Sequence, residues 1–467
     1  MRNTSYFEFL KTKNYAAPIA GFDISIDDLN QHLFQWQKEV VRWALKKGKC
    51  ALFLDTGLGK TICQLVWANI ISHKEGMNVI IFAPLAVSHQ TKKEGEKYGI
   101  NVHISRGQED VRPGINIANY EIMGKFNPLS FIGIVLDESS IIKHFGGKTA
   151  SRLIDTYKDT KYKMCCTATP APNDYMEIGM HSEFLGIMRR SEMLSTFFVH
   201  DSGDTSKWRL KGHAESKFWE WVASWACVVK TPEDLGYSSA GYVLPELKIT
   251  HHIVESKKNM SDGGQCLMFA EYAKTLSDRR KARKNSLSER ILKAAEIANS
   301  SNEQVLLWCD LNVESNALSK VIHGAVEVQG ADSIEHKVNS IIKFVDGDIK
   351  AIVSKSSIYG FGINLQNCHK IIFVGLSDSF ELYYQAIRRC YRYGQKNSVE
   401  VHVITSESEG SVKDNIERKQ QDAMRMAKEM AKYTNKIMKE TIYGTTRISE
   451  SYLPQKKMIV PNWLEVA

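Results

Sequence analysis

Three short stretches of the sequence carry residue types that suit the chemistry of a polyphosphate. "FLDTGLGKT" (53–61) has a lysine and a threonine directly after two glycines, and "IVLDESSIIK" (134–143) has two adjacent acids. "QAIRRCYRYGQ" (385–395) has three arginines and no acid. Lysine, arginine and glycine-rich backbone bind phosphate oxygens, whereas paired acids bind a metal ion or direct a water molecule. Together the three stretches predict a site that binds ATP and Mg²⁺.

The first stretch fits a phosphate-binding loop, because it follows a predicted strand and opens a predicted helix. Gly57 and Gly59 let backbone N–H groups turn toward the phosphates, and the helix N-terminus adds its positive dipole end. We expect Lys60 to reach the β- and γ-phosphates and Thr61 to bind Mg²⁺. The strict G-x-x-x-x-G-K-T pattern is not met, since Leu54 stands where its first glycine belongs.

The second stretch ends a predicted apolar strand with Asp137 and Glu138. Two carboxylates buried at the end of a strand are costly unless a cation or a reactant shares the site. We therefore expect Asp137 to hold Mg²⁺ through water and Glu138 to polarise the attacking water.

A further stretch, "CCTATPAPND" (165–174), places two hydroxyls after another predicted strand. By itself it is a turn. In the company of the other motifs, Thr167 and Thr169 are candidates for coupling the nucleotide to a lobe interface.

The arginine-rich stretch lies far along the chain. If it is helical, Gln385, Arg389 and Arg392 fall at i, i+4 and i+7 and share one face. Such a face is often only solvated, but it can also meet an anion. An arginine that faces a γ-phosphate across a cleft stabilises the charge that develops during phosphoryl transfer. We expect Arg389 and Arg392 to complete the ATP site in this way. Upstream, "YGFGINLQNCHKIIFVG" (359–375) predicts a glycine turn between strands.

Composition narrows the class of protein. The 467 residues are 43% hydrophobic and 24% charged, with a net charge of +8, which permits a nucleic-acid partner without requiring one. No apolar run approaches the roughly 18 residues that span a bilayer, so no membrane role is expected. The nine cysteines include no C-x-x-C pair, and we interpret them as reduced core residues of an intracellular protein.

Two series of short apolar runs alternate with helical patterns, which predicts an α/β fold with parallel sheets. The predicted strands lie in 50–55, 78–84, 115–119, 131–138 and 163–169, and then in 246–254, 304–311, 325–330, 349–355, 370–376 and 399–405. We expect a first lobe over 1–185, a Trp-rich helical insertion over 186–245, a second lobe over 246–410 and a C-terminal helix and tail over 411–467.

Two segments keep alternative interpretations. The Trp-rich material near 205–225 is either the core of a helical subdomain or a base-stacking, strand-separating element. The basic run "RRKARK" (279–284) is either a solvated face or a set of phosphate contacts.

With these residues in view, the sequence resembles superfamily 2 helicase-type ATPases, and among them the Swi/Snf-type DNA translocases. "GLGKT", "TATPAPN" and "GFGINLQNCHKIIFVG…QAIRRCYRYGQ" look like motifs of that family in the right order, and the first phosphate-loop glycine is routinely absent there. The resemblance covers roughly residues 30–180 and 300–405. The acid motif departs from the family, which usually continues Asp-Glu-Ala-His, because Ser139 and Ser140 follow the two acids here.

The resemblance implies two tandem RecA-like lobes and adds binding residues. Gln37, within "LFQWQKEVVRWAL" (33–45), matches the glutamine that reads the adenine edge. The expected nucleotide-binding residues are Gln37, Thr56, Gly57, Leu58, Gly59, Lys60, Thr61, Gly362 and Gln385. The expected nucleic-acid contacts are Ser88, Asn119, Tyr120, Ser354 and Lys355.

The function expected from these features is that of a DNA-dependent ATPase that moves on double-stranded or branched DNA without sequence specificity. RNA is a weaker alternative, because "YRYGQ" is unlike the ending found in RNA helicases. Two other functions stay open: a strand-separating helicase, and a weakly hydrolysing ATP-controlled DNA clamp. The compact chain resembles motors of bacteria and bacteriophages, which implies the cytoplasm of a bacterial or phage-infected cell.

Overall fold

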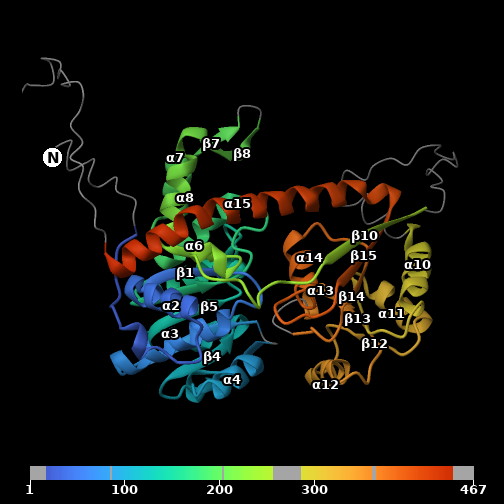
Figure 1. The fold of residues 1–467 in the computed structure, drawn as a ribbon, viewed down its shortest axis with the longest axis horizontal. Coiled ribbons are helices and arrows are strands. Elements are labelled where there is room, and N and C mark those ends of the chain that lie inside the picture. Colours follow the sequence, from blue (N-terminus) through green and yellow to red (C-terminus); the bar gives the residue numbers. More distant parts are fainter. Residues whose placement is uncertain (1–16, 85–86, 202–203, 256–284, 360–363, 445–467) are drawn as a thin grey trace, which may run out of the picture.

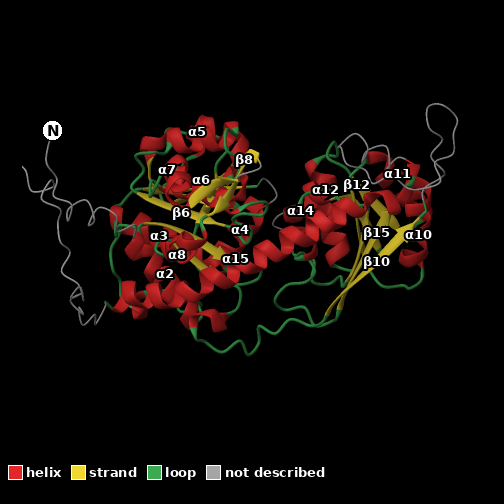
Figure 2. Ribbon diagram, turned by 90° about the horizontal axis from the view of Figure 1, so that it is seen from above, coloured by secondary structure: helices red, strands yellow, loops and turns green. Residues whose placement is uncertain are grey.

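A computed structural model of the chain describes residues 17–84, 87–201, 204–255, 285–359 and 364–444. These residues form two lobes that lie side by side (Figure 1). Each lobe is a parallel sheet with helices packed against it, as the view turned by 90° also shows (Figure 2).

The first lobe is built on a seven-stranded sheet in the order β3-β4-β2-β5-β6-β1-β9. All neighbouring strands in it are parallel. Its strands are β1 (Lys49–Leu54), β2 (Asn78–Ala83), β3 (Val102–Ile104), β4 (Ile115–Asn119), β5 (Phe131–Asp137), β6 (Tyr162–Cys166) and β9 (Ala226–Val229). Side chains alternate between the two faces of the sheet, so Leu52 and Phe53 belong to different core clusters.

The second lobe is built on a six-stranded parallel sheet in the order β10-β15-β14-β11-β13-β12. Its strands are β10 (Leu247–Val254), β11 (Val305–Cys309), β12 (Ala325–Val328), β13 (Ala351–Lys355), β14 (Lys370–Val374) and β15 (Val399–Ser406). A separate antiparallel pair, β7 (Phe198–Asp201) and β8 (Asp204–Leu210), projects from the first lobe (Figure 1).

Helices cover both sheets. Those of the first lobe are α2 (Gln35–Lys47), α3 (Lys60–Glu75), α4 (Ser88–Lys97), α5 (Lys148–Thr156), α6 (Ile178–Leu185), α7 (Arg190–Phe197) and α8 (Glu215–Ala223). Those that follow are α10 (Leu287–Asn299), α11 (Asn312–Val321), α12 (Ile334–Val345), α13 (Ser356–Tyr359), α14 (Phe380–Ile387) and α15 (Gly410–Tyr443). Two short 3₁₀ helices matter for the site, η4 (Tyr120–Lys125) and η6 (Ser139–Ile142). Within the described ranges, no helix is both long enough and apolar enough to cross a membrane.

This architecture confirms the predicted fold of two tandem RecA-like lobes with parallel sheets. Every strand that the sequence predicted falls on an observed strand. The strands β3, β7, β8 and β9 were not predicted, because β3, β7 and β9 have only three or four residues and β8 lies in aromatic, charged sequence.

The prediction of a separate helical insertion over 186–245 is wrong in two respects. The segment contains the β7–β8 pair, and its last strand, β9, pairs with β1 inside the first sheet. Phe218, Trp219 and Trp225 are fully buried and belong to the same core cluster as one face of that sheet. The tryptophans are therefore core residues, as the first interpretation held, but the core is that of the first lobe.

The long helix α15 connects the two lobes (Figure 1). Near its start, Val412 and Ile416 pack in the core of the second lobe. Farther along, Met430 and Met438 pack in the two core clusters of the first lobe. One continuous helix is thus part of both lobes, which limits how they can move relative to each other.

Candidate nucleotide site between the lobes

The phosphate loop, residues 55–59, leaves β1 and leads into α3. Gly57 and Gly59 both have positive φ, at 84° and 79°, a conformation that favours glycine. Gly59 is also the N-cap of α3, so the helix N-terminus opens directly from the loop. Lys60 donates from Nζ to the carbonyl oxygen of Leu54 at 2.9 Å, which keeps its ammonium beside the loop. The predicted order of strand, loop and helix is what the structure contains.

Gly59 also has no room for a side chain, because Gln37 packs directly against it. A Cβ added to Gly59 would lie 2.4 Å from the amide nitrogen of Gln37. That nitrogen donates to the carbonyl of Leu58 at 3.0 Å, and the amide oxygen accepts from the backbone N–H of Phe34 at 2.9 Å. Gln37 therefore supports the loop directly, while its predicted role toward adenine stays a prediction.

The acid motif, Asp137 and Glu138, lies where β5 ends. Burial and the neighbouring charge of Glu138 raise the pKa of Asp137 to about 7, although the positive charge of Lys60 lowers it. Glu138 has a φ of 50°, and its N–H donates to the Asp137 carboxylate at 3.1 Å. The left-handed conformation costs a non-glycine residue about 1–3 kcal/mol and is concentrated at functional sites. Two acids that disfavour each other's charge are a suitable place for a cation.

Mg²⁺ fits this set of donors. Magnesium takes hard oxygen ligands and is commonly held by only one or two carboxylates together with phosphates and water. Among the described residues no cluster of three or more His, Cys, Asp or Glu side chains could hold a metal ion. The assignment of Mg²⁺ to Asp137 and to the hydroxyl of Thr61 stays a prediction from the sequence.

The serines that follow the acid motif are packed inside the lobe. The hydroxyl of Ser139 lies 3.1 Å from Nε2 of His181, and both side chains are buried. Burial lowers the pKa of His181 to about 4, so the ring is neutral at pH 7. Ser140 is buried as well. The departure from the family pattern is thus accommodated by a polar contact behind the acids, which sequence reasoning missed because α6 gives no local signal for it.

The arginine turn, residues 388–394, differs from its prediction. The helix α14 ends at Ile387 and the chain continues as turns, so Arg389 and Arg392 do not share a helical face with Gln385. Both arginines nevertheless interact electrostatically with Glu138 of the first lobe. Their pKa values are lowered by burial and raised by the charge of Glu138, and the pKa of Arg389 is about 10.

A chain of hydrogen bonds crosses the cleft at this point. Gln385 donates from Nε2 to Glu138 at 3.3 Å, and its Oε1 accepts from Arg389 at 2.7 Å. Within the described part of the chain, Nε of Arg392 is buried and has no hydrogen-bond partner. Burial also lowers the pKa of Lys60, whereas the negative charges of Glu138, Asp55 and Asp137 raise it. Three cations, Lys60, Arg389 and Arg392, therefore interact electrostatically with the acid motif from two lobes, an arrangement that suits a polyphosphate with a metal ion.

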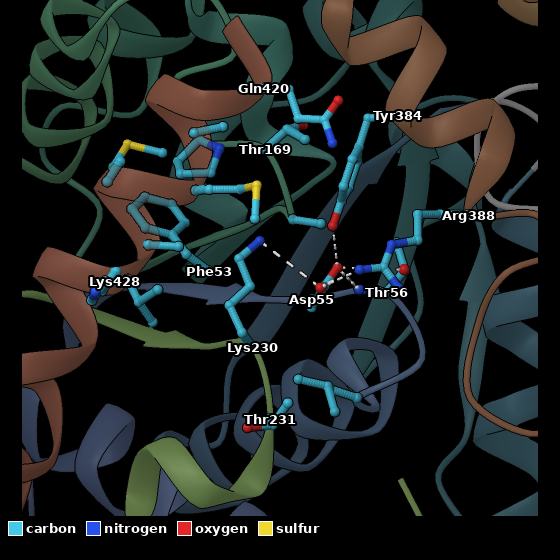
Figure 3. A pocket seen from close by; sticks show the side chains of 18 of the residues that line it. Phe53, Asp55, Thr56, Thr169, Lys230, Thr231, Tyr384, Arg388, Gln420 and Lys428 are labelled. Carbon is cyan, nitrogen blue, oxygen red and sulfur yellow. Dashed lines mark hydrogen bonds and ion pairs between the residues drawn. The ribbon is translucent and has the colours of Figure 1, made fainter. Parts of the chain in front are cut away.

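The predicted coupling residues follow β6. The side-chain oxygen of Thr167 accepts from the N–H of Thr169 at 3.1 Å, and both residues are buried. Thr169 also lines a cavity of about 760 Å³ between the lobes, which is shown in Figure 3. That cavity is lined by Asp55, Lys230 and Arg388 but by none of the acids or arginines expected to act on ATP.

The five predicted nucleic-acid contacts are not equivalent. Ser88, Tyr120 and Ser354 are buried, and the hydroxyls of the last two donate to backbone carbonyls within the lobes, at 2.6 Å and 2.9 Å. All three side chains are buried and do not face solvent. The hydroxyls of Tyr120 and Ser354 are already used in hydrogen bonds inside the lobes. Asn119 and Lys355 end strands and are partly exposed. Gly362 and the basic run 279–284 lie outside the described residues.

Comparison with known proteins places these features in a family. Residues 36–199 match the SNF2-related domain, and residues 283–394 match the helicase conserved C-terminal domain. Two relatives, from Xenopus tropicalis and Xenopus laevis, are each named a SWI/SNF-related matrix-associated actin-dependent regulator of chromatin subfamily A-like protein 1. They are 25% and 26% identical to the chain over 177 residues. Those matches cover 35% of this chain but only 19% and 18% of the relatives.

Among solved structures, the Sulfolobus solfataricus SWI2/SNF2 ATPase core in complex with dsDNA aligns with a TM-score of 0.41 and 18% identity. The alignment covers 90% of this chain and 98% of that one. The two domain matches cover strands β1–β6 of the first lobe and β11–β14 of the second, and they include the stretches 53–61, 134–143 and 385–394. The chain belongs to the superfamily 2 helicase-type ATPases of the Swi/Snf type.

Proposed function

We propose that the protein is a motor that hydrolyses ATP between its lobes and moves along duplex or branched DNA without sequence specificity. The observation that carries the proposal is the cross-lobe contact at the acid motif. Gln385 of the second lobe bonds to Glu138 of the first, and the charge of Glu138 acts on Arg389 and Arg392 of the second lobe. An ATPase motor that works by lobe closure requires residues of both lobes to meet at one site.

Each residue then has a chemical role. Lys60 binds the β- and γ-phosphates, and Glu138 orients the attacking water. Arg389 and Arg392 stabilise the negative charge that spreads over the γ-phosphate oxygens in the transition state. Thr61, and Asp137 through water, would hold Mg²⁺, which would further neutralise that charge when bound.

DNA is the proposed track because the relatives are named regulators of chromatin and this chain matches the SNF2-related domain. A motor of this kind contacts phosphates, so its DNA affinity should fall steeply with salt. RNA is a weaker alternative, because the arginine turn ends in "YRYGQ", unlike the corresponding stretch of RNA helicases.

Strand separation is the less favoured function. A wedge needs exposed aromatic rings, whereas Trp219, Trp221 and Trp225 are at most 2% exposed. Trp208, on β8, is partly exposed but its ring lies 3.7 Å from that of His200. The clamp alternative is also less favoured, because the buried Ser139 leaves both acids at the cleft.

Triplex displacement tests the proposal directly. An ATP-dependent motor that tracks along a duplex displaces a third strand, and Lys60→Ala should not. A forked duplex with a labelled strand, measured in parallel, reports strand separation. Displacement of the third strand without unwinding of the fork supports a translocase, whereas unwinding alone would favour the helicase. The bacterial or phage setting and the cytoplasmic location stay predictions from the resemblance.

A further inference from the structure

Asp55 is an acid of the phosphate loop for which the mechanism above has no role. It directly follows β1, and only 5% of its surface is exposed. Its carboxylate accepts hydrogen bonds from the hydroxyl of Tyr384 at 2.6 Å and from the guanidinium of Arg388 at 2.8 Å. The ammonium of Lys230 lies 3.9 Å away, and Figure 3 shows these groups converging on the carboxylate. Because Tyr384 and Arg388 belong to the second lobe, this carboxylate joins the two lobes.

The charges of the cluster favour this contact. Burial opposes ionisation of Asp55, but Lys230, Arg388 and Tyr384 outweigh it and hold the pKa of Asp55 below its ordinary value. Burial likewise opposes the charge on Arg388, and Tyr384 and Asp55 raise its pKa. Both partners are therefore charged at neutral pH. A hydrogen bond between two ionised groups is short, strong and directional.

The phosphate loop meets the arginine turn a second time. A Cβ added to Gly57 would lie 2.9 Å from Cβ of Tyr393 and 3.0 Å from its backbone nitrogen. Gly57 thus permits a close approach of Tyr393 that no other residue type allows. The loop contacts the turn at Arg388 through Asp55 and at Tyr393 through Gly57, and the two arginines expected to act on ATP lie between these contacts in the sequence.

Several hydrogen bonds, among them those from Gln366 to Tyr393 and from Gln395 to Cys390, hold the turn in its own lobe, but they do not join it to the first lobe. The helix α14 ends at Ile387, so Arg389 and Arg392 are not carried by a helix. The N–H of Leu365 donates to the carbonyl of Arg389 at 3.0 Å, which holds the backbone within the second lobe. That bond does not determine where the turn lies relative to the phosphate loop. The hydrogen bonds that Tyr384 and Arg388 donate to Asp55 join the turn to the loop.

We propose that Asp55 is a positioning residue that ties the arginine turn to the phosphate loop through Arg388 and Tyr384. Arg388 then serves as an anchor and does not contact ATP. The proposal rests on the proposed function for its effect on turnover, since it assigns Asp55 the task of keeping Arg389 and Arg392 in register with the γ-phosphate. A displacement of about 1 Å in a positioned group can cost about 10²-fold in rate.

The test compares Asp55→Asn, Arg388→Gln and the double variant with the unmodified protein. ATP turnover and the affinity for a fluorescent ATP analogue are measured with duplex DNA present. We expect turnover to fall by about 10²-fold in each single variant with nucleotide affinity retained. The double variant should lose no more than the worse single variant, because both changes break the same contact. Tyr384→Phe, which removes one hydroxyl and keeps the ring, should cause a smaller loss in a folded protein.

Hydrogen exchange provides a readout that does not depend on activity. In Asp55→Asn the backbone amides of residues 388–394 should exchange faster, while those of β1 keep their protection. Asp23→Asn is the matched control, since it breaks an Asp–Arg bond of the same 2.8 Å length within the first lobe. It should change neither turnover nor exchange in the arginine turn.

Three results would overturn the proposal: normal turnover in Asp55→Asn, additive losses in the double variant, or unchanged exchange over 388–394. If the unmodified protein itself fails to hydrolyse ATP, the proposed function fails, but the exchange comparison still decides whether Asp55 anchors the turn.

Discussion

Replacing Arg392 by alanine is the sharpest probe of the cleft. Arg392 is partly exposed, but its Nε is buried and, within the described residues, has no hydrogen-bond partner. Burial lowers its pKa, which Glu94 and Glu138 only partly offset. A partly buried, incompletely bonded cation that interacts with the acid motif is suited to meet an anion that arrives with the substrate.

The expected loss follows from the charge. Two unit charges about 4 Å apart interact by about 4 kcal/mol at an effective dielectric constant of about 20. Each ~1.4 kcal/mol in the barrier changes the rate tenfold. If that interaction is made mainly in the transition state, Arg392→Ala should lower kcat by about 10³-fold, within the range measured for arginines of this type.

The assay is steady-state ATP hydrolysis with saturating duplex DNA, together with nucleotide affinity from a fluorescent analogue. Arg425→Ala is the control, since Arg425 lies on the surface of α15 and pairs with Glu215 away from the cleft. We expect the control to match the unmodified protein. Arg392→Ala should bind nucleotide and DNA normally and turn over slowly. A variant that loses only DNA affinity, with kcat intact, would refute the placement of Arg392 at the γ-phosphate.

Three further predictions follow from single residues. Glu138→Gln should bind ATP and DNA but hydrolyse ATP only slowly, because an amide cannot polarise the attacking water; full activity in rapid-quench measurements would exclude that role. Burial lowers the pKa of His181 from 6.5 to about 4, so the unfolded chain binds a proton that the folded protein does not. The free energy of unfolding should therefore fall by about 3 kcal/mol as the pH drops from 6.5 to 4, and denaturant titrations of His181→Gln should lack this part. Gly57→Ala places a methyl group against Tyr393 at a positive φ, so it should lower kcat; unchanged kinetics would mean that the loop and the turn separate during turnover.

Much of the fold is encoded in local patterns. Continuous apolar runs such as "NVIIFAP" and "KIIFVG" predict buried parallel strands, and both became central strands. The phosphate loop was predictable for the same reason, since its glycines, lysine and flanking elements are adjacent in the sequence. The short run "ACVV" at β9 carried a usable signal, but the aromatic residues around it favoured a helical interpretation.

Contacts between distant residues were not predictable. The bond from Tyr384 to Asp55 joins residues 329 positions apart, and that from Gln385 to Glu138 spans 247 positions. Helical spacing predicted that Gln385, Arg389 and Arg392 share one face, but α14 ends at Ile387 and the arginines lie in the turns that follow. The contact between Ser139 and His181 is likewise created only when α6 folds over the acid motif.

The measurement that tests the central claim most directly is steady-state ATP hydrolysis by the purified protein and by Lys60→Ala. It is made without nucleic acid and then with single-stranded, duplex and branched DNA and with RNA. We predict strong stimulation by duplex or branched DNA, and no hydrolysis by Lys60→Ala under any condition. A rate that stays near background with every nucleic acid, or that survives in Lys60→Ala, would contradict the account of a DNA-dependent motor with its engine at this cleft.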